Sequence, residues 1–393
     1  MLVPTAAVVG PVQAACAYEV IQLFHVPDCG SVNIRGMANV AGHVTGEWTC
    51  GLGDQRAFYC DMDDGLFHDL GIGSGSWGLR VNDLAEVSGQ TDAVPVVWFQ
   101  GKPVTFEMST PDDDGEVRAR NNHGLMAGWF WTPDPPYGAC MWTEDGTFVD
   151  LAPLMPLPHS GLKDCNDAGQ LVGYSHGTDY PKDEIGILVE DGRVTVLEPI
   201  PGGYTSHAQH ISESGAIAGI GLVEAPEYPG WYKRGFYRTP SGEMVNIGID
   251  ATHKWCLPSD VNSLGQVVGT FQKGAQTKAF IWQDGVLTYL VPRLHVPEGV
   301  PEDFYFGNSY MTVNDRGWIA AKGGSDSTGD LWIAVLAPIG SAPGDANKDC
   351  TVDVKDIQLL LDHWGEDGPV ADCNGDGVVD GADLGMILAD WSR

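Results

Sequence analysis

A nine-residue phrase that recurs seven times between residues 38 and 321 limits most strongly how this 393-residue chain folds. Each copy has a polar turn built on Asn-x-x-Gly or a close substitute, then an apolar pair and a small residue. The copies are 38–46 (ANVAGHVTG), 81–89 (VNDLAEVSG), 120–128 (RNNHGLMAG), 165–173 (CNDAGQLVG), 211–219 (ISESGAIAG), 261–269 (VNSLGQVVG) and 313–321 (VNDRGWIAA). Their starts lie 39 to 52 residues apart. A period of this length is typical of repeat architectures.

Four strands are predicted in most periods. The turn between two apolar runs predicts a β-hairpin in each copy, and a third strand rich in aromatic and β-branched residues follows. In six copies a tight turn ending in glycine then leads into a fourth strand. Four strands per period is the strand count of a propeller blade. We therefore expect an all-β, seven-bladed β-propeller over residues 18–337.

The seventh copy has no fourth strand of its own. After its third strand, at 331–335, the chain passes Pro338 and Pro343. Residues 18–23 (YEVIQL) have the pattern of a fourth strand and precede the first copy. Pairing this segment with the seventh copy would close the ring and leave no open sheet edge. The alternatives are six blades with one degenerate copy, or two smaller β domains.

Two acidic loops of identical spacing follow a linker at 338–343 and lie within a second domain, residues 344–393. In such a loop, alternate side-chain oxygens and one backbone carbonyl supply the ligands that Ca²⁺ needs. The first loop offers Asp345, Asn347, Asp349, Thr351, Asp353 and Asp356, and the second offers Asp372, Asn374, Asp376, Val378, Asp380 and Asp383. We expect two Ca²⁺ ions as cofactors.

A short amphipathic helix is predicted after each loop. Its apolar stripe is Ile357, Leu360, Leu361 and Trp364 in one case and Leu384, Ile387, Leu388 and Trp391 in the other. We expect each stripe to pack against its twin, which makes both tryptophans core residues. Cys350 replaces the glycine found at Gly377, where φ > 0 is favoured, so the first site should bind more weakly. A disulfide between Cys350 and Cys373 is also expected.

The duplicated loops that end in Asp, with no helix ahead of the first one, resemble a type I dockerin over about fifty residues. This resemblance implies a calcium-folded module that docks onto cohesin modules and attaches secreted proteins, most often polysaccharide-degrading enzymes, to a scaffold. Two features depart from the pattern: the connecting segment 365–371 is short, and the pairs Val354-Lys355 and Gly381-Ala382 do not match each other. The phrases at 166–173 and 279–285 resemble extracellular HAF repeats, which implies a secreted β-repeat protein without a defined activity.

Composition excludes some partners and suggests a location. The formal net charge is −32 with only 21 Lys and Arg residues, so nucleic acid would be repelled. Residues 1–17 are apolar and end in small residues, as in a signal peptide, although a buried first strand is the alternative. No stretch is long enough to span a bilayer. We expect a protein that is extracellular or at the cell surface.

Aromatic residues cluster in two of the loops that join second and third strands, which share one rim of the ring. The candidate glycan contacts are Trp129, Trp131 and Tyr137 in one loop region and Tyr228, Trp231 and Tyr232 in the other. Flat aromatic faces bury the C–H side of a sugar, although these rings could also simply cap blade edges. No catalytic constellation is recognised in the sequence.

Three functions are consistent with these patterns. The first is a non-catalytic secreted propeller that binds a polysaccharide or protein and is assembled through its calcium module. The second is a glycoside hydrolase or polysaccharide lyase with its site on the propeller rim. The third is a structural or adhesive surface protein.

Overall fold

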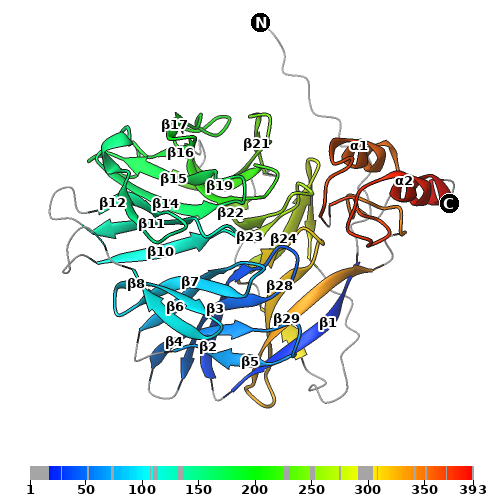
Figure 1. The fold of residues 1–393 in the computed structure, drawn as a ribbon, viewed down its shortest axis with the longest axis horizontal. Coiled ribbons are helices and arrows are strands. Elements are labelled where there is room, and N and C mark those ends of the chain that lie inside the picture. The colour runs from blue at the N-terminus through cyan, green and yellow to red at the C-terminus, as the bar shows by residue number, and fades with distance from the viewer. Residues whose placement is uncertain are drawn as a thin grey trace, which may run out of the picture.

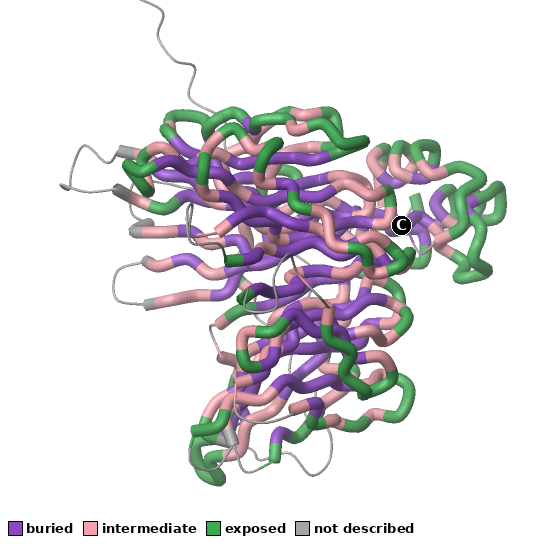
Figure 2. The backbone as a smooth tube through the Cα atoms, turned by 60° about the vertical axis from the view of Figure 1, so that its left-hand side comes forward, coloured by how far each residue is buried: buried purple, intermediate pink, exposed green. Residues whose placement is uncertain are grey.

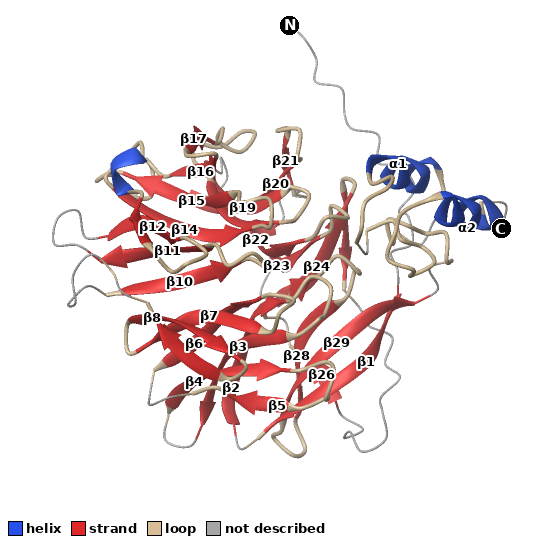
Figure 3. Ribbon diagram, in the orientation of Figure 1, coloured by secondary structure: helices blue, strands red, loops and turns tan. Residues whose placement is uncertain are grey.

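Seven antiparallel sheets are arranged around one axis, and two short helices follow them (Figure 1). The computed structural model describes residues 17–391 apart from 28, 51–52, 72–74, 107, 109–113, 132–136, 225–230, 248–252, 274–275, 291–303, 308, 340–341, 350–351 and 369. Outside the two helices and the 3-10 turn Ala152–Leu154, the regular structure of these residues is strand (Figure 3). The predicted seven-bladed β-propeller is therefore confirmed.

Six blades are continuous in sequence, with strands paired in chain order from the axis outward. Blade 1 is β2 (Cys29–Met37), β3 (Val44–Cys50), β4 (Asp54–Cys60) and β5 (Phe67–Asp69), and blade 2 is β6 (Ser76–Val81), β7 (Glu86–Thr91), β8 (Val94–Phe99) and β9 (Lys102–Thr105). Blade 3 is β10 (Gly115–Arg120), β11 (Met126–Trp131), β12 (Tyr137–Trp142) and β13 (Phe148–Asp150), and blade 4 is β14 (His159–Cys165), β15 (Leu171–His176), β16 (Ile185–Glu190) and β17 (Arg193–Val196). Blade 5 is β18 (His207–Ile211), β19 (Ile217–Glu224), β20 (Trp231–Arg238) and β21 (Met244–Asn246), and blade 6 is β22 (His253–Val261), β23 (Val267–Lys273), β24 (Gln276–Gln283) and β25 (Val286–Tyr289).

The seventh blade joins the two ends of the ring. Its inner position is shared by β26 (Phe304–Phe306) and β27 (Thr312–Val313), and β28 (Ile319–Ser325) and β29 (Leu331–Ile339) follow. The outer strand is β1 (Ala17–Val26), which runs antiparallel to β29 from the Ala17–Ile339 pair to the Val26–Leu331 pair. The predicted clasp between the first and last strands is confirmed, and β29 continues through Pro338.

The core lies between neighbouring sheets (Figure 2). Between blades 1 and 2, for example, Ala57 and Leu70 pack against Val96 and Trp98. The Trp98 indole nitrogen also donates to the Leu70 carbonyl at 3.0 Å, so a large apolar ring is buried with its one polar atom satisfied. Each blade thus buries both faces of its sheet against its neighbours.

Asparagine in the repeated phrase fastens one blade to the next. The Asn82 side chain donates to the Asn121 carbonyl at 3.2 Å, and Asn121 donates in turn to the Asn166 carbonyl at 3.0 Å. Asn314 reaches the Ala38 carbonyl at 3.4 Å across the closure of the ring. We call the turns that contain these residues the phrase turns; together they form one end of the propeller axis.

The first copy differs from the predicted alignment. Ala38 stands where five of the other copies have asparagine and the fifth copy has Ser212, since its carbonyl receives the bond that Asn121 receives elsewhere. Its turn is also one residue longer, because Ala38 bonds to His43 whereas Asn82 bonds to Glu86. Asn39 therefore does not play the role that the sequence alignment gave it.

The C-terminal helices are α1 (Val354–Asp362) and α2 (Gly381–Asp390). Leu360 and Ile387 are fully buried between them, as predicted. Trp364 and Trp391, in contrast, are 49% and 43% exposed, and Leu361 and Leu388 are both 55% exposed, so the assignment of these four residues to the buried stripe is wrong. In each helix the apolar stripe is wider than the face that the other helix covers.

Candidate functional site

A β-bulge at the same place in six inner strands shapes the propeller axis. The pairing of first with second strand skips one residue in each of blades 1 to 6. The skipped residues are Arg35, Leu79, Arg118, Lys163, Gln209 and Ser259, and all six line one cavity of about 230 Å³. We call it the axial cavity. Bulges turn side chains in new directions, and they are frequent beside binding sites.

The last glycine of the phrase makes room for each bulge. A Cβ atom on Gly89 would lie 1.8 Å from the Trp77 carbonyl oxygen, and one on Gly128 would lie 2.0 Å from that of Glu116. The corresponding distances in the other four bulged blades are 2.0 to 2.3 Å. In the seventh blade, where the inner position is split between two short strands, Ala321 takes this place.

A charged cluster closes the cavity toward the phrase turns. Arg80 lies 2.8 Å from Asp164 and 3.5 Å from Asp260, and it also contacts His210. The Arg80 guanidinium holds the pKa of Asp164 below its usual value, against the opposing effect of burial. Because two carboxylates neutralise Arg80, we assign this cluster a structural role as the floor of the cavity.

Three further cations line the cavity wall. Arg35 makes a bidentate pair with Glu47, at 2.7 and 2.9 Å, and Arg118 contacts Glu116. Lys163 makes no ion pair with any described residue; its ammonium lies 5.2 Å from the centre of the Tyr174 ring. Burial, and then the neighbouring Arg118, lower the pKa of Lys163 to about 7.

A histidine–glutamate pair lies beside this lysine. His207 stacks on Tyr174 with ring centroids 4.6 Å apart, and its Nδ1 lies 2.8 Å from Glu184. The other ring nitrogen, Nε2, is buried without a hydrogen-bond partner. Burial lowers the pKa of His207. The ring is therefore a neutral base whose orientation Glu184 fixes.

The aromatic residues predicted to contact glycans are only partly placed. Trp129 donates to Glu116 at 2.7 Å and contacts Tyr137, whose hydroxyl lies 3.1 Å from His176. Trp131 is 43% exposed. Tyr232 lies under the Arg234 guanidinium, 5.3 Å from its centre. Tyr228 and the Trp231 side chain lie outside the described residues.

The two acidic loops have matched geometry. The Asn347 backbone N–H donates to the Asp356 carboxylate at 3.1 Å, and 27 residues later the Asn374 backbone N–H donates to Asp383 at 3.0 Å. Both terminal aspartates also accept from the amide of the helix N-cap, Asp353 or Asp380, and both are fully buried. Burial, followed by Asp349 and Asp353, raises the pKa of Asp356. A buried carboxylate among other carboxylates fits a hard divalent cation held by oxygen.

The expected disulfide of the C-terminal module is absent, and two of the module's predicted residues lie outside the part of the chain that the structure describes. Cys373 carries a free thiol, so the expected disulfide with Cys350 is not formed in the structure, and Cys350 and Thr351 lie outside the described residues. Val379 pairs through backbone bonds with the connecting segment, at Gly365 and Glu366.

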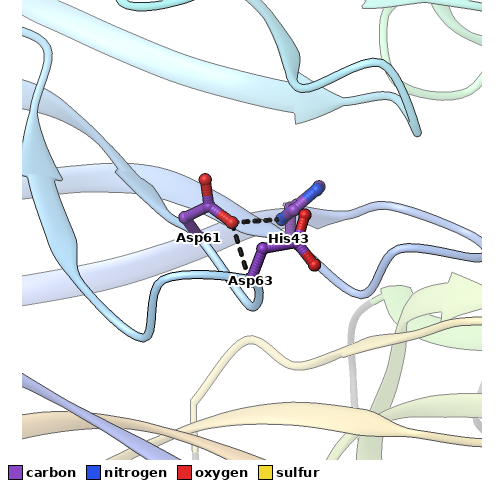
Figure 4. Close-up of side chains that lie close together, drawn as sticks. All are labelled: His43, Asp61 and Asp63. Atoms are coloured by element: carbon purple, nitrogen blue, oxygen red, sulfur yellow. Dashed lines mark hydrogen bonds and ion pairs between the residues drawn. The ribbon is translucent and has the colours of Figure 1, made fainter.

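A second group of acidic residues, Asp61 and Asp63, lies in a turn of blade 1. Asp61 lies 3.3 Å from His43 and accepts from the Asp63 amide at 2.8 Å (Figure 4). His43 Nδ1 in turn lies 3.2 Å from the Met62 amide nitrogen. These are contacts within and between neighbouring turns of blade 1, so these acids are turn residues.

The cavity lysine and arginines were not singled out from the sequence. The signal was present, because Lys163, Arg118 and Leu79 each stand two residues before a copy of the phrase. Comparing that position across all copies would have shown cations in the third and fourth copies, Arg118 and Lys163, in an acidic protein. The same comparison misses Arg35, because the turn of the first copy is one residue longer and Arg35 stands three residues before the phrase.

Comparison with known proteins identifies the fold. The β-propeller domain of the trilobed protease from Pyrococcus furiosus, described as having an open velcro topology, superposes with a TM-score of 0.53 at 11% identity, over 77% of this chain and 95% of that one. The chain has a β-propeller fold. Virginiamycin B lyase from Staphylococcus aureus gives 0.48 at 12% identity, over 81% and 99%, and a Pyrococcus horikoshii acylaminoacyl peptidase gives 0.48 at 12%, over 74% and 49%.

No protein-family profile matches the chain, and no curated protein matches its sequence. Among the described residues, no helix is both long and apolar enough to cross a membrane. In contrast to the open topology described for the Pyrococcus furiosus domain, this propeller is clasped by β1 and β29.

Proposed function

We propose that this chain is a secreted, glycan-binding propeller whose dockerin-like C-terminal module binds two Ca²⁺ ions and joins the protein to a cohesin-like partner outside the cell. The matched loops carry the proposal. Two loops whose first and last aspartates accept the same backbone bonds, and whose last aspartates are fully buried, are built to surround cations.

An exposed apolar surface supports docking by the module. Leu361 and Leu388, both 55% exposed, occupy corresponding positions 27 residues apart, as do Trp364 and Trp391. Large exposed apolar side chains on a small module are typical of a partner interface. We call these four residues the docking residues. Their duplicated positions match the duplicated loops.

Aromatic residues of blade 3 support glycan binding, and Glu116 links one of them, Trp129, to the cavity residue Arg118. Trp131 offers an exposed ring, while Trp129 and Tyr137 are held in place by Glu116 and His176. Rigid rings beside polar groups can bury one face of a sugar while the polar groups bond its hydroxyls.

A capture experiment tests docking. The full chain is offered to immobilised cohesin modules in calcium and in chelator, together with a polysaccharide panel. We expect capture in calcium only, and retention of at least one glycan. The Trp364→Ala/Trp391→Ala variant should lose capture but keep glycan retention, and Trp131→Ala should show the converse. If none of the cohesin modules captures the protein and the protein retains none of the glycans, the proposal is refuted.

A polysaccharide lyase is the second candidate, and His207 favours it over a glycoside hydrolase. Its Nδ1 is bonded to Glu184, and its Nε2 is buried outside the cavity lining with no hydrogen-bond partner among the described residues. Once the ring turns toward the cavity, Nε2 could remove the C5 proton of a uronate, while Lys163 would stabilise the negative charge that develops on the carboxylate. The pair of carboxyl groups that glycoside hydrolysis needs is not found among the residues that line the axial cavity. Ultraviolet absorbance of the unsaturated product tests this candidate; new reducing ends without absorbance would contradict it.

A further inference from the structure

The axial cavity concentrates positive charge in a strongly acidic protein. The chain carries 53 acidic residues against 21 Lys and Arg residues, yet Arg35, Arg80, Arg118 and Lys163 all line this cavity. Among the described residues that line it, none carries a carboxylate. Since four basic side chains that approach one another repel, this arrangement is costly unless something else favours it.

Most of that charge is neutralised inside the protein. Arg80 is held by Asp164 and Asp260, Arg35 by Glu47, and Arg118 by Glu116. Lys163 is the exception among the described residues that line the cavity, because no carboxylate lies within ion-pair distance of it. A half-buried ammonium without a counterion is a group that a bound anion would stabilise.

We propose that the axial cavity binds one uronate residue of a glycan, whose carboxylate pairs with Lys163 and with the guanidinium of Arg118. This inference builds on the proposed glycan binding and names its ligand class. One unpaired cation matches one carboxylate. Gln209, Ser259 and Tyr310 also line the cavity and offer hydrogen bonds to sugar hydroxyls.

The volume of the cavity and the net charge of the chain limit which ligands fit. A cavity of about 230 Å³ is smaller than the roughly 300 to 1,000 Å³ of drug-sized ligand sites, so it suits one sugar ring. A polyanion with a charge on every residue would be repelled by a chain of net charge −32. The fitting ligand is therefore a glycan in which a single uronate stands among neutral sugars.

Binding should couple to proton uptake. The pKa of Lys163, lowered to about 7 by burial and Arg118, rises when an anion binds, so affinity falls as the pH increases through that value. The groups around it are Arg118 and Glu116 of β10, Glu184 ahead of β16, Tyr174 of β15, and His207 and His210 of β18. The pKa of His207 is itself lowered by burial.

Calorimetric titration of the full chain with galacturonate, glucose and polygalacturonate tests the inference. We expect galacturonate to bind at least about tenfold more tightly than glucose, with weaker binding near pH 9 than near pH 6. Lys163→Met should lower galacturonate affinity about tenfold, and Lys163→Arg should keep it. Lys102→Met, at an exposed position on β9, is the matched control and should change nothing.

Equal affinity for galacturonate and glucose, or galacturonate affinity unchanged in Lys163→Met, would overturn the inference. If acetate binds as tightly as galacturonate, the cavity selects any carboxylate, and the claim that it recognises a sugar is overturned. Tighter binding of polygalacturonate than of the monosaccharide would overturn the single-uronate component. If the protein retains neutral glycans but does not prefer galacturonate, this inference is refuted and the proposed function stands. If it binds galacturonate but retains no polysaccharide, the proposed function is refuted and this inference stands.

Discussion

At the scale of single residues, the final glycine of the repeated phrase links the sequence repeat to the cavity. Its missing side chain lets the inner strand bulge, and the bulge turns one residue of each blade toward the axis. The glycine that made the repeat recognisable is thus the same residue that shapes the candidate binding site.

Gly128→Ala tests this role. The added methyl would lie 2.0 Å from the Glu116 carbonyl oxygen, so we expect a loss of about 1–3 kcal/mol in the free energy of unfolding. Gly385→Ala is the control, because it lies within α2 with open space around it and should stabilise slightly. Denaturant titration measures both; equal stability of Gly128→Ala and the unsubstituted protein would contradict the account.

The raised pKa of Glu213 makes the free energy of unfolding depend on pH. It accepts from the Asp167 amide at 2.7 Å and from Asn39 at 3.2 Å, and burial raises its pKa to about 8. Because the folded pKa lies above the ordinary value of 4.5, the stability that it contributes is full below pH 4.5 and is lost as the pH rises through 8. Asp315, with its pKa raised to about 6 by burial, acts in the same direction.

Thermal unfolding between about pH 5 and pH 9 checks this expectation. The melting temperature should fall with rising pH in the unsubstituted protein, and the fall should be smaller in Glu213→Gln, whose amide oxygen can still accept the Asp167 bond. Identical pH profiles for the two proteins would show that Glu213 does not control this behaviour.

At the scale of elements, the clasp decides whether the ring stays closed. β1 supplies the outer strand of the seventh sheet, and Phe24 and Val26 are buried against it and blade 1. Its loss would expose the edge of β29 and remove apolar contacts from two blades.

Deletion of residues 1–26 should therefore lower the melting temperature and promote association through the exposed edge, whereas deletion of residues 1–16 leaves β1 intact and should change neither. Calorimetry and light scattering distinguish the two proteins. A monomeric Δ1–26 chain as stable as Δ1–16 would contradict the clasp.

At the scale of the whole molecule, the C-terminal module lies over the phrase-turn end of the axis. His363, residues 366–368 and Val370 line a cavity of about 340 Å³ together with phrase-turn residues such as Asp83 and Glu213. Lys355 pairs with Asp284 at 2.7 Å, and Gln283 donates to the Asn347 carbonyl at 2.9 Å. The module thus covers one end of the axis, while the axial cavity lies beyond Arg80, on the other side of the floor.

Much of this arrangement could be predicted from the sequence, because it depends on local patterns. The blade number and the clasp follow from the repeated phrase and from the one strand left over at residues 18–23. The exposure of Leu361, Leu388 and the two tryptophans did not follow, since it depends on how much of each apolar stripe the other helix covers. Lys163 was missed because its environment is made by strands from several blades, which no single repeat contains.

Calcium titration of the full chain, followed by calorimetry, tests the central claim most directly. We predict uptake of two Ca²⁺ ions per chain, reduced to one in Asp383→Ala, which removes the last ligand of the second loop while the first loop is unchanged. Chelation should lower the melting temperature of the unsubstituted protein. No calcium uptake, together with a melting curve unchanged by chelator, would contradict the claim that these loops are calcium sites.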